Sequence, residues 1–319
     1  MPSCWGEMQR LDKELTLDNF RSALSSAVAG QDRFLLTYLQ ERLTRMVGND
    51  PQNGLKLLSW AEEAGEGLEL IVYMEALKKA PAVQNPKVSG RLLQLAENPK
   101  NSLALRAATV IGLETQKSFD AATLTRMKAL AVDGAVEQVA WNATRTIGRV
   151  MEEDFKNGGN YKPYWEQLLE ISRESEDRAV RALALEMPVY ANLVLDEKAV
   201  TALCDIMRTE RDKEVRELAA MRLSVTEAPQ KSLDAYRAAF ATETEFCVRW
   251  AFFRYALRAA GPAALPLVQQ FAQQEPRLMQ TYLDFKEVYD QGTHDWERVF
   301  MAKGPTAHVE CMDSHGEGQ

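Results

Sequence analysis

Three side chains that bind metals lie close together near the C-terminus. His308, Cys311 and His315 form a His-x2-Cys-x3-His pattern, with Glu310 and Asp313 between them. On a helix, the two histidines and the cysteine would share one face, and imidazole and thiolate are ligands that zinc prefers. The pattern is therefore the best candidate for a metal centre in this sequence.

The composition around this pattern favours a different interpretation. The segment GPTAHVECMDSHGEGQ opens with Gly-Pro, ends in glycines and contains no lysine or arginine. Such a composition is typical of a terminal segment without a fixed fold, and three ligands at a chain end match known metal-site spacings poorly. We therefore predict an acidic C-terminal tail over residues 301–319 and no bound cofactor, with the metal site as the alternative.

The rest of the sequence offers little for acid–base or nucleophilic catalysis. The third histidine is His294, so residues 1–293 contain none, and a Ser-His-Asp or Cys-His arrangement is excluded there. The patterns Gly-x-x-x-x-Gly-Lys-Ser/Thr and Gly-x-Gly-x-x-Gly are absent. Carboxylates cluster at residues 62–63 and 152–154, where a solvated helix face or a loop explains them. We predict that the protein is not an enzyme.

The charge of the chain limits the partners that it can bind. The 319 residues include 38 Lys and Arg and 46 Asp and Glu, which gives a net charge of -8. Nucleic-acid phosphates and anionic lipid surfaces both require a basic protein surface. We therefore expect neither nucleic acid nor a membrane as partner, and we expect a protein partner that carries a basic patch.

The cysteines and the N-terminus indicate a cytoplasmic protein. Cys4, Cys204, Cys247 and Cys311 include no Cys-x-x-Cys pair and are too sparse for a disulfide framework. The N-terminal residues lack the basic start and apolar run of a secretory signal. No stretch approaches the roughly 20 apolar residues that span a bilayer. We expect reduced thiols and a cytoplasmic location.

Apolar residues recur at helical spacing along most of the chain. Leu57, Leu58 and Ala61, for example, fall on one helix face. Strand signals are nearly absent, since no alternating run of β-branched residues is bounded by a hairpin turn. These patterns predict an all-α protein.

One pattern recurs three times in the second half of the chain. An acidic residue is followed after three positions by Val-Arg and after seven by a core residue, in the segments Asp177–Ala184, Asp212–Ala219 and Glu245–Phe252. The acid can cap the N-terminus of a helix, and the valine lies on the face that packs against a neighbouring helix. We predict that Arg181, Arg216 and Arg249 are structural and pair with the acids that open the adjacent segments.

These segments resemble the second helices of HEAT repeats, a family of α-solenoids. The resemblance implies that helix pairs stack side by side, because one pair alone cannot bury its apolar face. It implies a right-handed solenoid of about six to eight HEAT-like hairpins over residues 19–300, after an N-terminal cap or partly disordered segment at residues 1–18. Some HEAT-like proteins resemble DNA glycosylases with a basic concave surface, a function that the net charge of -8 disfavours.

The second helices of such pairs usually line the inner curve of the solenoid, which makes their outward positions candidates for binding. Positions two and six residues after the core valine point away from the core. They hold the candidate partner-binding residues Trp141, Arg145, Glu186, Glu217, Trp250 and Arg254. An exposed tryptophan beside an arginine is the composition of an interface anchor. The alternative is that each tryptophan packs under the next unit and donates its indole N–H to a loop carbonyl.

The sequence thus predicts a non-enzymatic scaffold or adaptor that binds a partner protein through an extended helical surface. The acidic charge favours a basic partner through electrostatic steering, and an inhibitor or immunity-type protein that covers a basic toxin is one version. Two alternatives stay open. One is a metal-dependent enzyme or accessory factor that uses His308, Cys311 and His315. The other is a HEAT-like nucleic-acid binder of the DNA-glycosylase type.

Overall fold

The fold of the described residues is entirely helical. The computed structural model describes residues 4–133, 137–187, 196–225, 229–293, 298, 300, 301, 310 and 311. Within these residues every regular element is a helix, and no strand is present. The prediction of an all-α protein is therefore confirmed. Most of the segment predicted to be an acidic tail, residues 301–319, lies outside the described residues.

The chain forms two compact units, residues 1–183 and residues 184–319. The first unit contains α1 (Cys4–Glu14), α2 (Phe20–Ala29), α3 (Arg33–Val47), α4 (Pro51–Ala64), α5 (Gly67–Lys79), η1 (Pro81–Gln84), α6 (Pro86–Glu97), α7 (Leu103–Gly112), η2 (Leu113–Thr115), α8 (Ala121–Val132), α9 (Glu137–Lys156) and α10 (Lys162–Glu174). The boundary falls within α11 (Arg178–Glu186). The second unit contains α12 (Glu197–Thr209), α13 (Lys213–Leu223), α14 (Pro229–Phe240), α15 (Phe246–Ala260), η4 (Gly261–Ala264), α16 (Leu265–Gln274), η5 (Pro276–Leu278) and α17 (Met279–Asp290).

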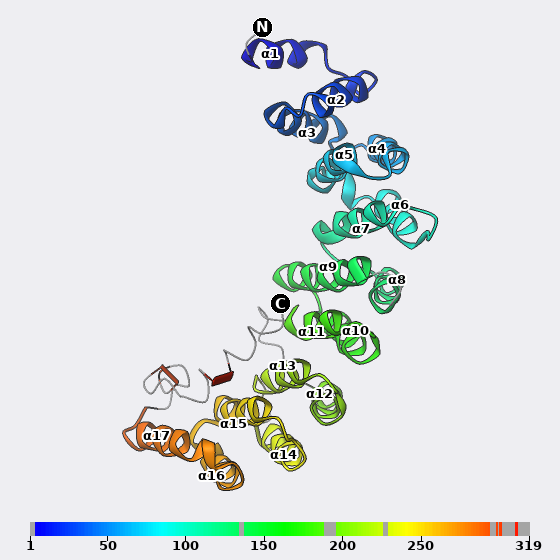
Figure 1. Cartoon of the computed structure of the whole chain (residues 1–319). Helices are drawn as coiled ribbons and strands as arrows, with labels where there is room; N and C mark the ends of the chain where they lie inside the picture. The colour runs from blue at the N-terminus through cyan, green and yellow to red at the C-terminus, as the bar shows by residue number, and fades with distance from the viewer. Residues whose placement is uncertain are drawn as a thin grey trace. The chain divides into compact units, whose positions relative to one another are not determined.

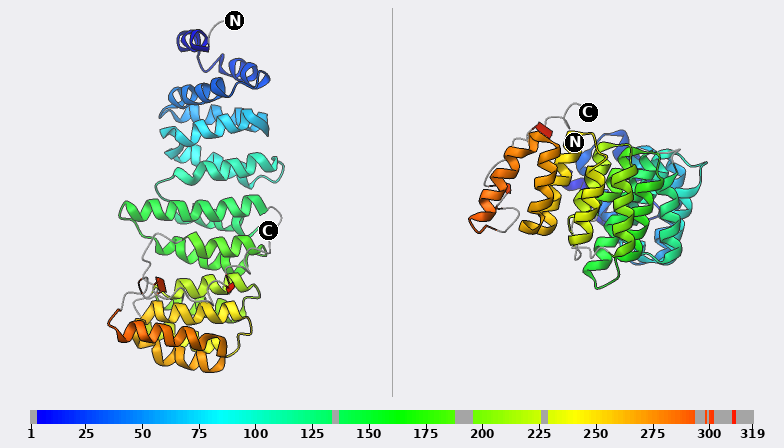
Figure 2. Two further views of the ribbon diagram at one scale, coloured as in Figure 1. Left: turned by 60° about the vertical axis from the view of Figure 1, so that its left-hand side comes forward. Right: turned by 90° about the horizontal axis from the view of Figure 1, so that it is seen from below.

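The helices of the first unit pack as successive pairs. α4 packs on α5, α6 on α7 and α8 on α9, while α3, α5, α7 and α9 contact one another in sequence. Figure 1 shows α3, α5, α7 and α9 on one side of this unit, with α4, α6 and α8 on the other. Figure 2 shows the same helices lying side by side in a second view. The residues predicted to share a core face, Leu57, Leu58 and Ala61, are all buried.

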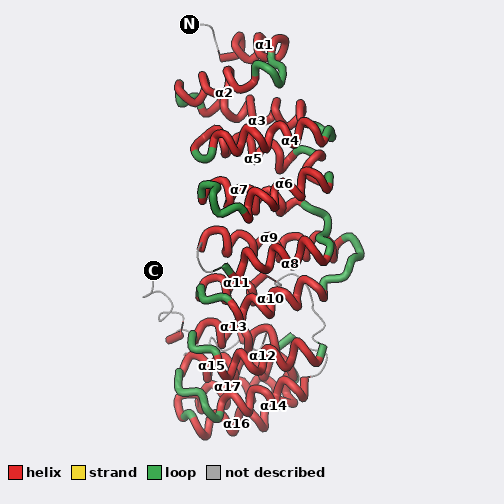
Figure 3. Tube along the Cα trace, turned by 90° about the vertical axis from the view of Figure 1, so that its right-hand side faces the viewer, coloured by secondary structure: helices red, strands yellow, loops and turns green. Residues whose placement is uncertain are grey.

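The second unit repeats this pairing. α12 packs on α13, α14 on α15 and α16 on α17, and α13 also packs on α15 (Figure 3). In the repeated pattern Val215, Ala219, Val248 and Phe252 are fully buried, so the predicted core face of these helices is confirmed. Phe252 fills a position where the other segments have alanine, and its ring packs beside Tyr236 on α14.

The acids of the repeated pattern begin their own helices. Asp212 accepts hydrogen bonds from the backbone N–H groups of Glu214 and Val215, at 3.0 and 3.2 Å. Asp177 accepts one from Ala179 at 2.7 Å. These bonds satisfy donors that a helix N-terminus leaves free. Glu245 makes no such side-chain cap, so the prediction of capping holds for the two aspartates and is wrong for the glutamate.

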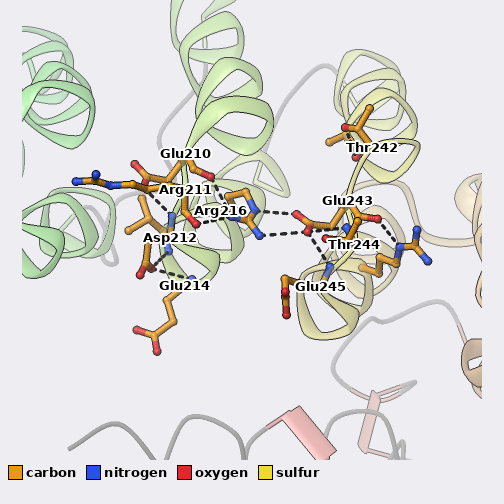
Figure 4. Close-up of polar contacts among 12 residues, drawn as sticks. Glu210, Arg211, Asp212, Glu214, Arg216, Thr242, Glu243, Thr244 and Glu245 are labelled. Atoms are coloured by element: carbon orange, nitrogen blue, oxygen red, sulfur yellow. Dashed lines mark hydrogen bonds and ion pairs between the residues drawn. The ribbon is translucent and has the colours of Figure 1, made fainter.

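The arginine of the pattern joins two turns, but its carboxylate partner differs from the predicted one. Arg216 Nη1 donates to the carbonyl oxygens of Glu210 and Arg211 in the turn before α13, at 2.9 and 3.0 Å. Its Nε and Nη2 donate to both carboxylate oxygens of Glu243, at 2.7 and 3.1 Å (Figure 4). Glu243 lies before α15, so this interaction, here called the arginine clamp, ties together two successive helix pairs. The predicted partner Glu245 is not used, because it lies two residues beyond the carboxylate that the guanidinium reaches.

The clamp recurs at the next helix pair. Arg249 Nε donates to the carbonyl oxygen of Glu243 at 2.7 Å, and its Nη1 donates to Glu275 at 3.2 Å. Arg181 makes the corresponding bonds to the carbonyl oxygens of Ser175 and Glu176. The arginines are therefore structural, as predicted. Their shared role is to hold the turn that precedes their own helix.

A disulfide bond corrects the expectation that all thiols are reduced. Cys247 on α15 is bonded to Cys311, with a Cα–Cα distance of 5.4 Å. The two residues are 64 positions apart in the chain, and sequence alone does not show such a pairing. Cys204 is half-buried and outside any disulfide. Burial raises the pKa of the Cys204 thiol, which suits an inert core position.

None of the described helices has both the length and the apolar composition needed to cross a bilayer.

Candidate functional site

Among the predicted binding residues, the exposed Trp141 and the half-buried Arg145 form the best-defined pair. They lie one turn apart on α9, and the Arg145 guanidinium lies over the indole ring, 5.8 Å from its centroid. The Trp141 side chain is 38% exposed, so the prediction that it faces solvent is confirmed. Such a cation–π contact limits the rotamers of both side chains while leaving part of the ring accessible.

A buried carboxylate holds this arginine in place. Glu114 at η2 lies 3.3 Å from Arg145 Nε and 2.9 Å from Lys78 Nζ, and its side chain is only 7% exposed. A buried charge persists when opposite charges compensate its desolvation, and here two cations do so. Sequence reasoning did not identify Glu114 or Lys78, because the three charges are brought together only when α5, η2 and α9 pack.

A surface pocket adjoins this cluster. Its volume is about 460 Å³, and its lining residues are Lys78, Glu114, Thr115, Arg149, Glu152, Glu153 and Lys156. Within it, Glu152 pairs with Lys156 at 2.6 Å and with Arg149 at 3.6 Å. The charges in the pocket are thus largely paired with one another, an arrangement suited to polar recognition. The Thr115 hydroxyl in its lining donates a hydrogen bond to the Lys78 carbonyl oxygen at 3.2 Å.

Apolar side chains are exposed on the helices that precede α9 on the same side of the unit. They are Phe34 on α3, Leu68 and Ile71 on α5, and Leu103 on α7. Each lies in the first turn or two of its helix. These four side chains add exposed apolar area to three alternate helices of this unit.

Trp250, the second predicted anchor, is in the core. Its side chain is 1% exposed and packs against Phe253, Phe285 of α17 and Phe300, at centroid distances of 5.6, 6.4 and 6.5 Å. The prediction that it faces solvent is wrong, because later segments of the chain cover that side of α15. The alternative is confirmed in its main part, because Trp250 packs against Phe285 of the next helix pair. Its second part is wrong, since the indole Nε1 is buried without a hydrogen-bond partner in the described structure.

Arg254 and Glu217 also lie inside the second unit. Arg254 Nη2 is 3.9 Å from Glu217 Oε2, and both side chains are largely buried. The Arg254 guanidinium lies 5.9 Å from the Trp250 ring centroid and 4.6 Å from that of Tyr255. The predictions that Glu217 and Arg254 point out to solvent are therefore wrong. Glu217 instead joins α13 to α15 through a charge pair.

Glu186 is exposed at the C-terminal end of α11, as predicted. Its carbonyl oxygen accepts a hydrogen bond from Arg222 Nη2 at 2.8 Å, and the carbonyl of Leu185 accepts one from Arg222 Nε. A cation is favourable at a helix C-terminus, where carbonyl groups lack helical donors. Burial, with a smaller effect of Arg258, lowers the pKa of Arg222 to about 10, so the guanidinium stays charged at neutral pH.

The C-terminal metal pattern is not assembled in the described residues. His308 and His315 lie outside them. Cys311 is buried and bonded to Cys247, so its sulfur is not available as a thiolate ligand while the disulfide is intact. The described part of the chain contains no group of three or more His, Cys, Asp or Glu residues that could hold a metal ion. Cys311 as a metal ligand is therefore corrected to a disulfide cysteine.

The chain matches no protein-family model and no curated protein. The candidate site is therefore defined by the contacts and exposure of its own residues. It consists of the Trp141–Arg145 pair, the buried Glu114 that positions it, the adjoining charged pocket and the exposed apolar side chains on α3, α5 and α7.

Proposed function

We propose that the protein is a non-enzymatic interaction scaffold that binds a partner protein through the second helices of its helix pairs. In this proposal the pairs form a right-handed HEAT-like solenoid of about six to eight hairpins, and the protein works in the cytoplasm. The observation that carries the proposal is the exposed Trp141, which lies against an arginine fixed by the buried Glu114.

This arrangement suits binding because the anchor is preorganised. Ordering a long side chain at an interface costs about 0.5–1.5 kcal/mol, and Arg145 is already ordered by Glu114 and Trp141. Tryptophan and arginine are enriched among the residues that contribute most to protein–protein binding. The exposed Phe34, Leu68 and Leu103 extend the apolar contact area over neighbouring helices.

The partner class follows from the charge of the chain. A net charge of -8 favours association with a basic surface and opposes phosphate-rich partners. The acidic excess lies mainly in the second unit, which has 21 Asp and Glu against 15 Lys and Arg. We propose a basic protein partner, with neither nucleic acid nor membrane bound. An inhibitor or immunity-type protein that covers a basic toxin is one such arrangement.

Affinity capture with matched variants tests this function. Wild-type protein, Trp141→Ala and Leu283→Ala are used as bait in extracts of the native source, and the partner identified with wild-type protein is then titrated against each. Leu283 is a suitable control because it is an exposed apolar residue in the second unit. We expect Trp141→Ala to weaken binding by more than about 1 kcal/mol and Leu283→Ala to leave it unchanged. Equal affinity for all three baits would contradict the proposed anchor.

A further inference from the structure

The length of α9 explains why a pocket forms beside Glu114. This helix has 20 residues, whereas α7, on which it packs, has 10. The C-terminal turns of α9 therefore extend past the end of α7, and the helix also contacts η2. The pocket lies where these elements meet, and it is lined by Lys78 of α5, by Glu114 and Thr115 of η2, and by Arg149, Glu152, Glu153 and Lys156 of α9.

The more buried carboxylates of this pocket each lie between two cations. Glu152 is 20% exposed, and its carboxylate lies 3.6 Å from Arg149 Nη1 and 2.6 Å from Lys156 Nζ. Glu114 also lies between two cations, one of which is Arg145. By contrast, the side chains of Arg149 and Lys156 are 46% and 62% exposed. The cations of the pocket are thus more accessible to a partner than these two carboxylates are.

The third carboxylate does not reverse the sign of the local charge. Glu153 is exposed, and it accepts a hydrogen bond from Asn157 Nδ2 at 3.1 Å. Together with Arg145, the pocket contains four cations and three carboxylates, which leaves one positive charge. A chain with a net charge of -8 therefore has a locally cationic surface at the end of α9.

Arg149 has hydrogen-bond donors that the described residues do not use. Its ion pair with Glu152 is too long, at 3.6 Å, to be a hydrogen bond, and its guanidinium donates none to the described part of the chain. A guanidinium carries five N–H donors in a planar fork that fits a carboxylate through two parallel bonds. The helix dipole favours cations in the last turn of a helix, but Arg149 lies about two turns before the end of α9.

Arg149 also lies on the same side of α9 as the candidate anchor. Trp141, Arg145 and Arg149 follow one another at intervals of four residues, so they line one side of the helix. Eight residues at 1.5 Å each separate Trp141 from Arg149 by about 12 Å along the helix axis. One side of α9 therefore offers an indole ring at one end and a guanidinium with unused donors at the other.

We propose that the pocket takes a carboxylate side chain of the partner protein, which the Arg149 guanidinium binds through two N–H groups beside the positive charge of Lys156. The inference rests on the proposed function and adds the chemistry that the partner presents. The apolar side chain that packs on Trp141 then belongs to the same partner segment. In a helical segment the two partner side chains stand seven residues apart, because seven residues make two turns and span about 10 Å.

A partner that is basic as a whole is compatible with this carboxylate. Electrostatic steering depends on the summed charge of each surface, and it acts before the two proteins touch. Arg149 acts on one group after contact, where a charge-assisted hydrogen bond is short and directional.

Synthetic helical peptides test the inference on the full chain. The probe is an alanine- and lysine-based peptide with one leucine and one glutamate seven positions apart. Two control peptides carry glutamine or lysine in place of the glutamate. Fluorescence anisotropy at low salt measures the affinity of each peptide. We expect wild-type protein to bind the glutamate peptide at least fivefold more tightly than the glutamine peptide, and to bind the lysine peptide most weakly.

Matched variants of the protein assign this preference to Arg149. Arg149→Gln should bind the glutamate and glutamine peptides equally. Arg237→Gln should keep the fivefold preference, since Arg237 is an exposed arginine of the second unit that also pairs with a carboxylate on its own helix. Arg149→Lys keeps the charge but loses the fork, so it should show a smaller preference. Because Arg149 is exposed, the circular dichroism of its variants should match that of wild-type protein.

Three results would overturn the inference. They are equal affinity of wild-type protein for the glutamate and glutamine peptides, no binding of either peptide, and a preference for glutamate that persists in Arg149→Gln.

Trp141→Ala separates this inference from the proposed function. The variant should weaken the binding of the glutamate and glutamine peptides by the same factor, so that their ratio stays fivefold or more. Unweakened binding with an intact ratio would refute the Trp141 anchor and support the carboxylate site. Weakened binding with a ratio of one would refute the carboxylate site and support the anchor.

Discussion

At the residue scale, Trp141 and Trp250 show how far a helical pattern predicts a binding residue. Both lie two positions after a buried valine, and both lie beside an arginine one turn later. The pattern assigns them the same face of a helix. It does not show that Phe285 and Phe300 lie over the second tryptophan, because those residues are 35 and 50 positions further along the chain. Burial of this kind depends on packing between distant segments.

The difference in burial gives a prediction about stability. Trp250→Ala removes a buried ring that contacts three phenylalanines, and such truncations cost about 3–5 kcal/mol of the free energy of unfolding. Trp141→Ala removes a partly exposed ring and should cost about 1 kcal/mol or less. Urea denaturation of the oxidised protein, followed by circular dichroism, measures both. Similar losses for the two variants would contradict the burial that separates them.

At the element scale, the start of each repeated helix could be predicted in part. The aspartates before Val180 and Val215 cap their helices as expected, because capping is a local property. The carboxylate partner of Arg216 is not local. Glu243 lies 27 residues away and is reached only after two helix pairs have stacked. A sequence signal for it does exist, since a glutamate stands two residues before the opening acid at both 210 and 243.

The arginine clamp should contribute strongly to the second unit. Arg216 and Glu243 are both largely buried, and the arginine donates four hydrogen bonds. Arg216→Ala leaves the Glu243 carboxylate buried without this partner, a change that costs about 3–5 kcal/mol. Arg237→Ala is the control, because Arg237 is exposed and, among the described residues, pairs only with Asp234 on its own helix. Such a pair contributes about 0.3–0.5 kcal/mol. Denaturant unfolding of both variants measures the difference, and a loss below 1 kcal/mol for Arg216→Ala would refute the clamp.

The helix caps also predict a dependence of stability on pH. Asp120 accepts a hydrogen bond from the Thr123 backbone N–H at 2.7 Å, and this bond lowers the pKa of Asp120 below its usual value. The folded state therefore binds this proton less readily than the unfolded state. The stabilisation by the charged form is complete above the unfolded pKa of about 3.9 and is lost as the pH falls through the folded pKa.

Asp120→Asn tests this effect, because asparagine also caps helices but does not titrate. At pH 7 the wild-type protein should be more stable by about 0.5 kcal/mol, the contribution of a negative charge at a helix N-terminus. The difference should shrink as the pH is lowered from 5 to 3. The free energy of unfolding of both proteins across this range is the measurement. A constant difference would exclude a role for the charge.

At the scale of the whole molecule, composition and periodicity predicted the all-α class but not the covalent link between distant segments. Helical periodicity can be read in short windows of sequence, and it recurs in almost every window of this chain. The all-α class is therefore predicted correctly even when one helix is assigned wrongly. The bond between Cys247 and Cys311 depends on where α15 and the C-terminal residues come to lie. The sequence led us to expect four reduced thiols, because no cysteine spacing singles out Cys247 and Cys311 as a pair.

The net charge of the whole molecule makes association sensitive to salt. With a charge of -8, the protein attracts a basic partner over a range set by the Debye length, which is about 10 Å at 0.1 M salt and about 3 Å at 1 M. We expect the association rate constant to fall about tenfold or more between 0.05 and 0.5 M salt. The dissociation rate constant should change much less, because the apolar contact at Trp141 is not screened. Surface plasmon resonance with the captured partner measures both constants. An association rate constant that is independent of salt would show that charge does not steer this partner, and it would refute the proposed basic patch. It would not test the Trp141 anchor, because that contact is apolar.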